Sequence, residues 1–194
     1  TPGYAAFVAD AKAGLAVADA ALLLVEAVAG VQVITERVFQ YCQEYQVPRV
    51  FVINKLDREN ASFERTMQSI LERFDRRVVP IQIPIGAEAG FEGVVDLITM
   101  KAHRYAKDGS GQSTTGDLPA ALADMAKEYH AKLVEMVAES DDALMEIFFE
   151  SGEIPHDKMV AGLHKAFLER KIFPVVLASA IKAHGHHDVS YARD

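Results

Sequence analysis

The chain has 194 residues, of which half are hydrophobic, and it carries a formal net charge of −8 with a single cysteine. This length suits one packed domain, or one domain with a sizeable insertion. The acidic balance, without a long Lys/Arg block, excludes a broad basic surface for nucleic acid. Because Cys42 has no partner for an internal disulfide, we expect a reducing compartment.

Membrane and export signals are not predicted. The apolar run at 20–30 is about half as long as a membrane-spanning helix. The first residues, "TPGYAAF", place no basic segment ahead of a hydrophobic one, so a signal peptide is not expected. These features predict a cytoplasmic chain without a membrane segment.

The first 75 residues alternate between helical and strand-like patterns. Apolar spacing predicts helices at 7–18, 31–46 and 62–74, and continuous apolar runs predict strands at 20–28 and 49–53. The run at 20–28 suits a strand covered on both faces, as in a parallel sheet, and the run at 49–53 is again apolar and β-branched. The alternation is typical of βαβ units.

The middle of the chain has a different character. Residues 78–86 and 91–105 are rich in β-forming residues, and 106–119 reads as a flexible loop because of its Gly and Ser content. Helices are predicted at 120–138, 141–149 and 156–171, before a last apolar strand at 172–180. An α+β block therefore separates two α/β stretches.

Polar residues follow the strand at 49–53 directly, in the order Asn54, Lys55, Leu56, Asp57. A residue that reads guanine must accept hydrogen bonds from the ring N–H and the exocyclic amine, and the Asp57 carboxylate suits this paired role. Lys55 can lay its aliphatic stem over the base, and Asn54 can tie neighbouring loops together. The alternative is a solvated turn between a strand and a helix.

Two further stretches resemble loops of P-loop GTPases. Residues 1–3, "TPG", are similar to the end of the Asp-x-x-Gly loop that contacts phosphate and magnesium, where Gly3 would allow close approach. Ser179 and Ala180 end the last strand, which would place the Ala180 amide near the guanine carbonyl oxygen. The order of the three loops matches that of these enzymes.

From residue 1 to about residue 185 the chain resembles the translational GTPases, and elongation factor G in particular. "VFVINKLDRENASF" and "LASAIKAHG" resemble the family's fourth and fifth motifs, and the 122 positions between Asp57 and Ser179 hold "PIQIPIGAEAGFEGVVDLITMKAHRY", which is similar to its inserted subdomain. The resemblance implies an α/β fold: part of a three-layer αβα P-loop GTPase sheet with an inserted α+β subdomain.

The expected organisation divides the chain into G-domain residues 1–75, an inserted subdomain at 76–171, and the last strand, base loop and tail at 172–194. The resemblance also implies GTP or GDP with Mg²⁺ in the intact protein, action on the ribosome, and binding of a ribosomal stalk protein by the insertion. The acidic helices of the insertion can equally form a solvated face.

The sequence departs from the family at two places. Tyr4 stands where the family has the His that positions the attacking water, and a phenol is a poor general base at neutral pH. Tyr4 can instead pack against the following helix. In addition, "GxxxxGK[ST]" does not occur in the 194 residues. We therefore expect a fragment that binds nucleotide weakly and does not hydrolyse GTP alone.

Three further expectations concern self-association, the histidines of the tail and an alternative function. Strand 20–26 should form an exposed sheet edge, which favours self-association. His184, His186 and His187 suit zinc or nickel, but a surface loop is the simpler interpretation. As an alternative function, the chain is a non-hydrolysing protein-interaction module whose nucleotide loops are relics.

Overall fold

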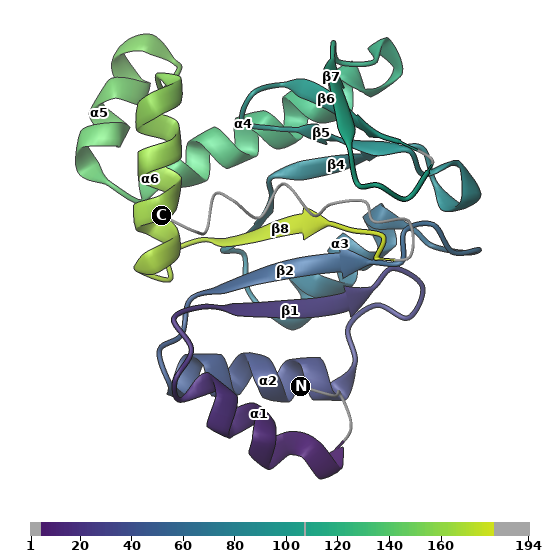
Figure 1. Cartoon of the computed structure of the whole chain (residues 1–194). Helices are drawn as coiled ribbons and strands as arrows, with labels where there is room; N and C mark the ends of the chain where they lie inside the picture. Colours follow the sequence, from purple (N-terminus) through teal and green to yellow (C-terminus); the bar gives the residue numbers. More distant parts are fainter. Residues whose placement is uncertain (1–4, 107, 181–194) are drawn as a thin grey trace.

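The structure, a computed structural model, describes residues 5–106 and 108–180. It contains a parallel sheet and an antiparallel sheet, each flanked by helices (Figure 1). The two sheets are joined by a buried hydrogen bond, in which the Leu177 backbone N–H donates to the Gln82 side chain at 2.9 Å.

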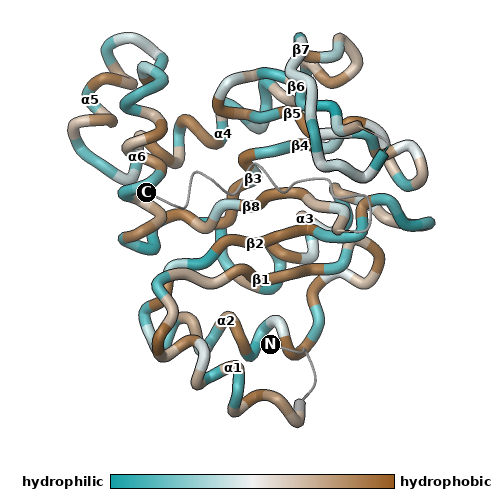
Figure 2. The backbone as a smooth tube through the Cα atoms, viewed as in Figure 1, coloured by the Kyte–Doolittle hydropathy of each residue, from teal (hydrophilic) through white to brown (hydrophobic). Residues whose placement is uncertain are grey.

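The parallel sheet holds the apolar strands of both ends of the chain, and Figure 2 shows hydrophobic residues concentrated along three of them, β1, β2 and β8. Its spatial order is β1-β2-β8-β3, and every pair is parallel. The strands are β1 (Ala21–Glu26), β2 (Arg49–Asn54), β3 (Val78–Pro80) and β8 (Phe173–Leu177). This arrangement brings the ends of β2 and β8 together, although the insertion separates them in sequence.

Three helices accompany the first strands, as predicted: α1 (Val8–Leu15), which follows the short helix η1 (Ala5–Phe7), then α2 (Val33–Glu44) and α3 (Phe63–Arg73). Phe39 of α2 lies at the centre of their core. Its ring centroid is 6.0 Å from Phe51 of β2, 5.7 Å from Phe173 of β8, and 4.5 Å from Phe74 at the end of α3. Helices α2 and α3 therefore cover the same face of the sheet. Cys42 is fully buried on α2, as its apolar helical face predicted.

A buried arginine completes this core. The guanidinium of Arg49 lies 4.0 Å from the ring centroid of Phe39 and 4.2 Å from that of Phe173. Its Nε and Nη1 atoms have no hydrogen-bond partner among the described residues, so the two aromatic faces provide the favourable contact. Burial lowers the pKa of Arg49 to about 10.

Strand β1 is covered on one face only, which corrects the prediction of burial on both. Leu22 is 51% exposed and Leu24 is 60% exposed, whereas Leu23 and Val25 are buried. Successive strand residues point to opposite faces, so the exposed pair lies on the face away from α2. On that face Val52 of β2, which is paired with Leu24, is only 8% exposed. The open area is therefore confined to the edge strand.

The antiparallel sheet has the order β4-β5-β6-β7. Its strands are β4 (Gln82–Ile85), β5 (Gly93–Asp96), β6 (Lys101–Tyr105) and β7 (Ser113–Gly116), and the short helix η2 (Glu88–Gly90) precedes β5. Strand β7 lies within 106–119, so the prediction of a continuous loop there is wrong. Thr114 and Thr115 favour a strand, but the Gly, Ser and Asp residues around them indicate a loop, and the pairing with β6 gives the strand its place.

The helices of the insertion follow as predicted: η3 (Ala120–Leu122), α4 (Ala123–Glu139), α5 (Asp142–Ser151) and α6 (His156–Leu168). Asp141 caps α5, because its side chain accepts a hydrogen bond from the Ala143 N–H at 3.0 Å. Gly152 ends this helix at φ 74°, a left-handed conformation that glycine adopts without strain.

The predicted fold class is confirmed: a parallel α/β sheet with flanking helices carries an additional subdomain built on an antiparallel sheet. Strand β3 pairs with β8 although it falls within 76–171. We therefore propose that the subdomain begins after Pro80.

Within 5–106 and 108–180, no helix combines the length and the apolar character that a membrane crossing requires.

Candidate functional site

The candidate site lies where β2 and β8 end. Adjacent parallel strands finish at the same edge of a sheet, and this edge is where open α/β folds hold ligands. Asn54 is the last residue of β2, and β8 ends at Leu177, two residues before Ser179. The structure thus brings together the described residues that the sequence singled out. In Figure 1 the arrowheads of β2 and β8 lie side by side at this edge.

Asp57 is oriented by the neighbouring loop. Its Oδ1 atom accepts a hydrogen bond from the Ser179 hydroxyl at 2.6 Å, across 122 positions of sequence. Ser179 is fully buried and Asp57 is half-buried, so this bond is partly shielded from water. Within the described part of the chain, Oδ2 has no hydrogen-bond partner. A carboxylate has about four acceptor positions, so both oxygens can still accept hydrogen bonds.

Asn54 ties the two loops together, which is the role expected for its amide. Its Oδ1 atom accepts hydrogen bonds from the backbone N–H of Lys55 at 2.8 Å and from that of Ala180 at 3.2 Å. The Ala180 N–H is therefore engaged within the protein, whereas the sequence assigned it to the guanine carbonyl oxygen. At 3.2 Å this bond is at the long end of the range, so a ligand oxygen can share or replace it.

Lys55 has a defined position. Its backbone adopts φ 64°, which turns the chain sharply after β2. Its ammonium lies 3.1 Å from the Glu26 carboxylate, and Arg58 contacts the same oxygen at 3.2 Å. Glu26, at the end of β1, is a site residue that the sequence reasoning missed. The available signal was an acidic residue at the end of an apolar strand.

The remaining predicted site residues lie outside the described part of the chain. These are Gly3, Tyr4 and the tail histidines His184, His186 and His187. Within 5–106 and 108–180, no group of three or more His, Cys, Asp or Glu side chains is placed to hold a metal ion. The described site residues thus form a polar edge at the ends of β2 and β8, without a cluster of three metal ligands among the described residues.

Comparison with known proteins adds a family and a solved structure. Residues 1–192 match the sequence profile of the family described as elongation factor Tu GTP binding domain. The crystal structure of a protein from Thermus thermophilus is similar, with 29% sequence identity and a TM-score of 0.86 over 95% of this chain. This chain spans 27% of the length of that one.

Proposed function

The chain belongs to the family of elongation factor Tu GTP binding domains, and from this premise we propose that the loops after β2 and β8 bind the guanine base of GTP and GDP. The observation that carries the proposal is the Asp57 carboxylate, which Ser179 orients at the open edge of the parallel sheet. Its unpartnered Oδ2 leaves an acceptor available on the side chain, within the part of the chain that the structure describes.

The chemistry of the base explains why a carboxylate suits this place. Guanine presents a ring N–H and an exocyclic amine side by side, and a carboxylate can accept from both. Adenine does not present two donors in this arrangement. A bound adenine would leave the half-buried Asp57 carboxylate with its bond from Ser179 but without the paired bonds from the base, and such a loss discriminates strongly between ligands.

Lys55 and Asn54 support this role in different ways. Glu26 holds the Lys55 ammonium at 3.1 Å, so the aliphatic stem of Lys55 has a defined direction in which to cover the base. Asn54 keeps the loop of β2 and the loop of β8 at a fixed separation through its bond to the Ala180 amide. Both residues thus position the edge against which a purine would lie.

The intact protein would then bind GTP with magnesium and act on the ribosome as an elongation factor G-like GTPase, which would place it in the cytoplasm. Gly3 would approach a phosphate, and Tyr4 would occupy the place of the family's histidine. The inserted subdomain is the proposed contact for a ribosomal stalk protein.

The test is competition between GDP and ADP for a fluorescent GDP analogue, on this chain and on the chain extended at its amino end to include a phosphate-binding loop. We expect GDP to compete and ADP to fail, and Asp57→Ala to abolish the difference. Glu59→Gln is the matched control, because Glu59 is exposed nearby in the same loop and should leave the preference unchanged. Equal competition by GDP and ADP would refute the proposal.

We also propose self-association through the edge of β1, where Leu22 and Leu24 are exposed. An unpaired strand edge with apolar side chains favours pairing with another chain. Sedimentation velocity of this chain should show dimers or larger species, and Leu22→Lys with Leu24→Lys should reduce them. A monomer at all concentrations would contradict this association.

A further inference from the structure

A second concave site lies in the inserted subdomain, away from the loops of the parallel sheet. It is a cavity of about 430 Å³ between α4, the end of α5 and the start of α6. Figure 1 shows α5 and α6 at the end of the parallel sheet opposite to the arrowheads of β1, β2 and β8. The volume falls within the range of small-molecule sites in proteins, about 300–1,000 Å³.

The cavity has an apolar lining. Ile98, Val134 and Met159 are buried, and Phe148 and Ile154 are half-buried around them. A flexible methionine beside an aromatic ring suits an apolar group of variable shape. The lining therefore favours the apolar body of a ligand, and the polar groups determine which head group fits.

His130 supplies a hydrogen-bond acceptor. Its Nδ1 atom lies 2.6 Å from the Leu97 carbonyl oxygen, and a carbonyl can only accept, so Nδ1 carries the proton. In the neutral imidazole, Nε2 is then an acceptor. This tautomer follows from the partner of Nδ1 and does not depend on any ligand.

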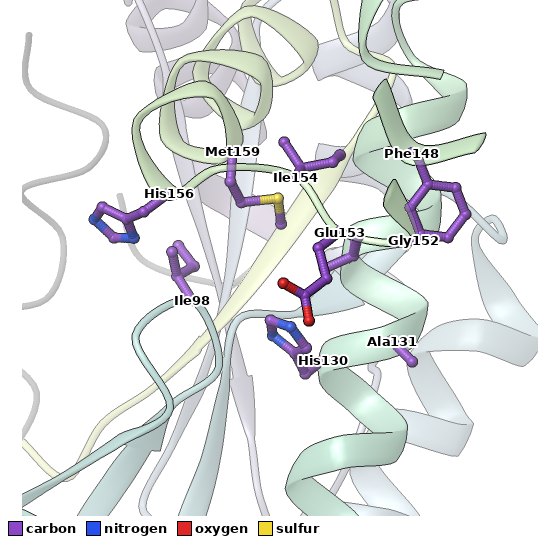
Figure 3. Close-up of a pocket in the computed structure, with 10 residues that line it drawn as sticks. Ile98, His130, Ala131, Phe148, Gly152, Glu153, Ile154, His156 and Met159 are labelled. Atoms are coloured by element: carbon purple, nitrogen blue, oxygen red, sulfur yellow. The ribbon is translucent and has the colours of Figure 1, made fainter. Parts of the chain in front are cut away.

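Glu153 supplies a second acceptor and a negative charge. Figure 3 shows its carboxylate pointing toward the ring of His130. Between these two described side chains there is no hydrogen bond and no ion pair, and the Glu153 carboxylate pairs with no Lys or Arg in the described ranges. Both side chains line one cavity, and among the described residues no donor is hydrogen-bonded to Nε2 of His130 or to the Glu153 carboxylate.

We propose that this cavity binds a small organic cation, an amidine, guanidine or amine carried on an apolar ring or chain. Its N–H groups would bridge the Glu153 carboxylate and Nε2 of His130, and its apolar body would pack on Met159 and Phe148. Such a cation supplies N–H donors for the two acceptors. It also supplies the positive charge that complements Glu153. This site is independent of the nucleotide loops.

Benzamidine is the probe for this site, and benzamide, its neutral counterpart of similar shape, is the control ligand. In ¹⁵N and ¹³C correlation spectra of the chain, benzamidine should produce saturable shifts at the Gly152 and Glu153 amides and at Cε1 of His130. The Cε1 signal of His164, which lies elsewhere on α6, should not move. Benzamide should cause no saturable shift at the same concentrations.

Two variants separate a specific contact from a general charge effect. Glu153→Gln should weaken benzamidine binding by about 10-fold, the size expected for a lost charge-assisted hydrogen bond. Glu150→Gln removes the same charge from the exposed surface of α5, outside the cavity, and should change binding by less than about 2-fold. Equal binding of benzamide, equal weakening by the two variants, or an unmoved His130 signal would each overturn the proposal.

Discussion

The parallel sheet and the helices of the inserted subdomain form their sites in different ways. At the parallel sheet, Asp57 and Ser179 are hydrogen-bonded across 122 positions of sequence. The cavity of the insertion is instead lined by residues between Ile98 and Met159, mostly from consecutive helices. The first site exists only when β2 and β8 are paired, whereas the second depends on local helix packing. The motif that follows β2 is thus only half of the proposed base site, and the other half follows β8, after the whole insertion.

The largest effect should come from a substitution in the hydrophobic core between the parallel sheet and the helices α2 and α3. Phe39→Ala removes the ring that contacts Phe51, Phe74 and Phe173, and should lower the free energy of unfolding by about 3–5 kcal/mol. Urea denaturation followed by circular dichroism measures this change. Phe149→Ala, at a residue of the insertion that is 80% exposed, should change stability by less than about 0.5 kcal/mol. Similar losses in the two variants would contradict the described core.

An intermediate effect should come from separating the two loops of the base site. Ser179→Ala leaves the half-buried Asp57 without its 2.6 Å hydrogen bond, which should cost about 1–2 kcal/mol of stability and weaken guanine binding. Benzamidine binding in the insertion should not change. Ser113→Ala, on the exposed strand β7, is the control and should alter neither quantity. If Ser179→Ala left guanine binding intact, the loops would not act together.

The smallest effect concerns the two segments that lead into the neighbouring strands β3 and β8. The hydrogen bond from Arg77 lowers the pKa of Asp75, and Arg77 also donates to the Arg170 carbonyl oxygen at 3.0 Å. Because the folded pKa lies below the ordinary 3.8, this contribution is present above pH 3.8 and is lost as pH falls through the folded pKa. At neutral pH, Asp75→Asn should cost about 0.5–1 kcal/mol.

The measurement is the free energy of unfolding of Asp75→Asn and of the unchanged chain between pH 7 and pH 2. The difference between the two should be constant near neutrality and should shrink below about pH 4. Asp19→Asn, at an exposed bend between α1 and β1, is the control variant. If the difference in unfolding free energy between Asp75→Asn and the unchanged chain grew as the pH fell, the claim that Arg77 lowers the pKa of Asp75 would be rejected.

Much of the fold could be predicted because apolar spacing is a local signal. The predicted helices of both regions formed within a few residues of their expected bounds. Strand β7, Ser113–Gly116, was not predicted because its two strand-favouring threonines lie among Gly, Ser and Asp residues, and its pairing with β6 is not visible in the local sequence. The coverage of β1 was misjudged for a related reason: an apolar run shows that a strand suits burial, but it does not show which neighbours are present.

The candidate site could be predicted in part. The position of Asp57 and Ser179 at one edge follows from the rule that parallel strands end together. The ion pair between Glu26 and Lys55 could not be anticipated, because it depends on the pairing of β1 with β2. The bond from the Ala180 amide to Asn54 likewise depends on the exact separation of two loops, which residue identities do not specify.

The most direct test of the account is the base preference of Asp57→Asn, measured by titrating GDP and xanthosine diphosphate into the extended chain. Xanthine carries an oxygen where guanine carries the exocyclic amine, and an Asn amide can donate to that oxygen. The account predicts that Asp57→Asn prefers the xanthine nucleotide, while the unchanged chain and Glu59→Gln prefer GDP. An Asp57→Asn variant that still prefers GDP would contradict the claim that Asp57 reads the base.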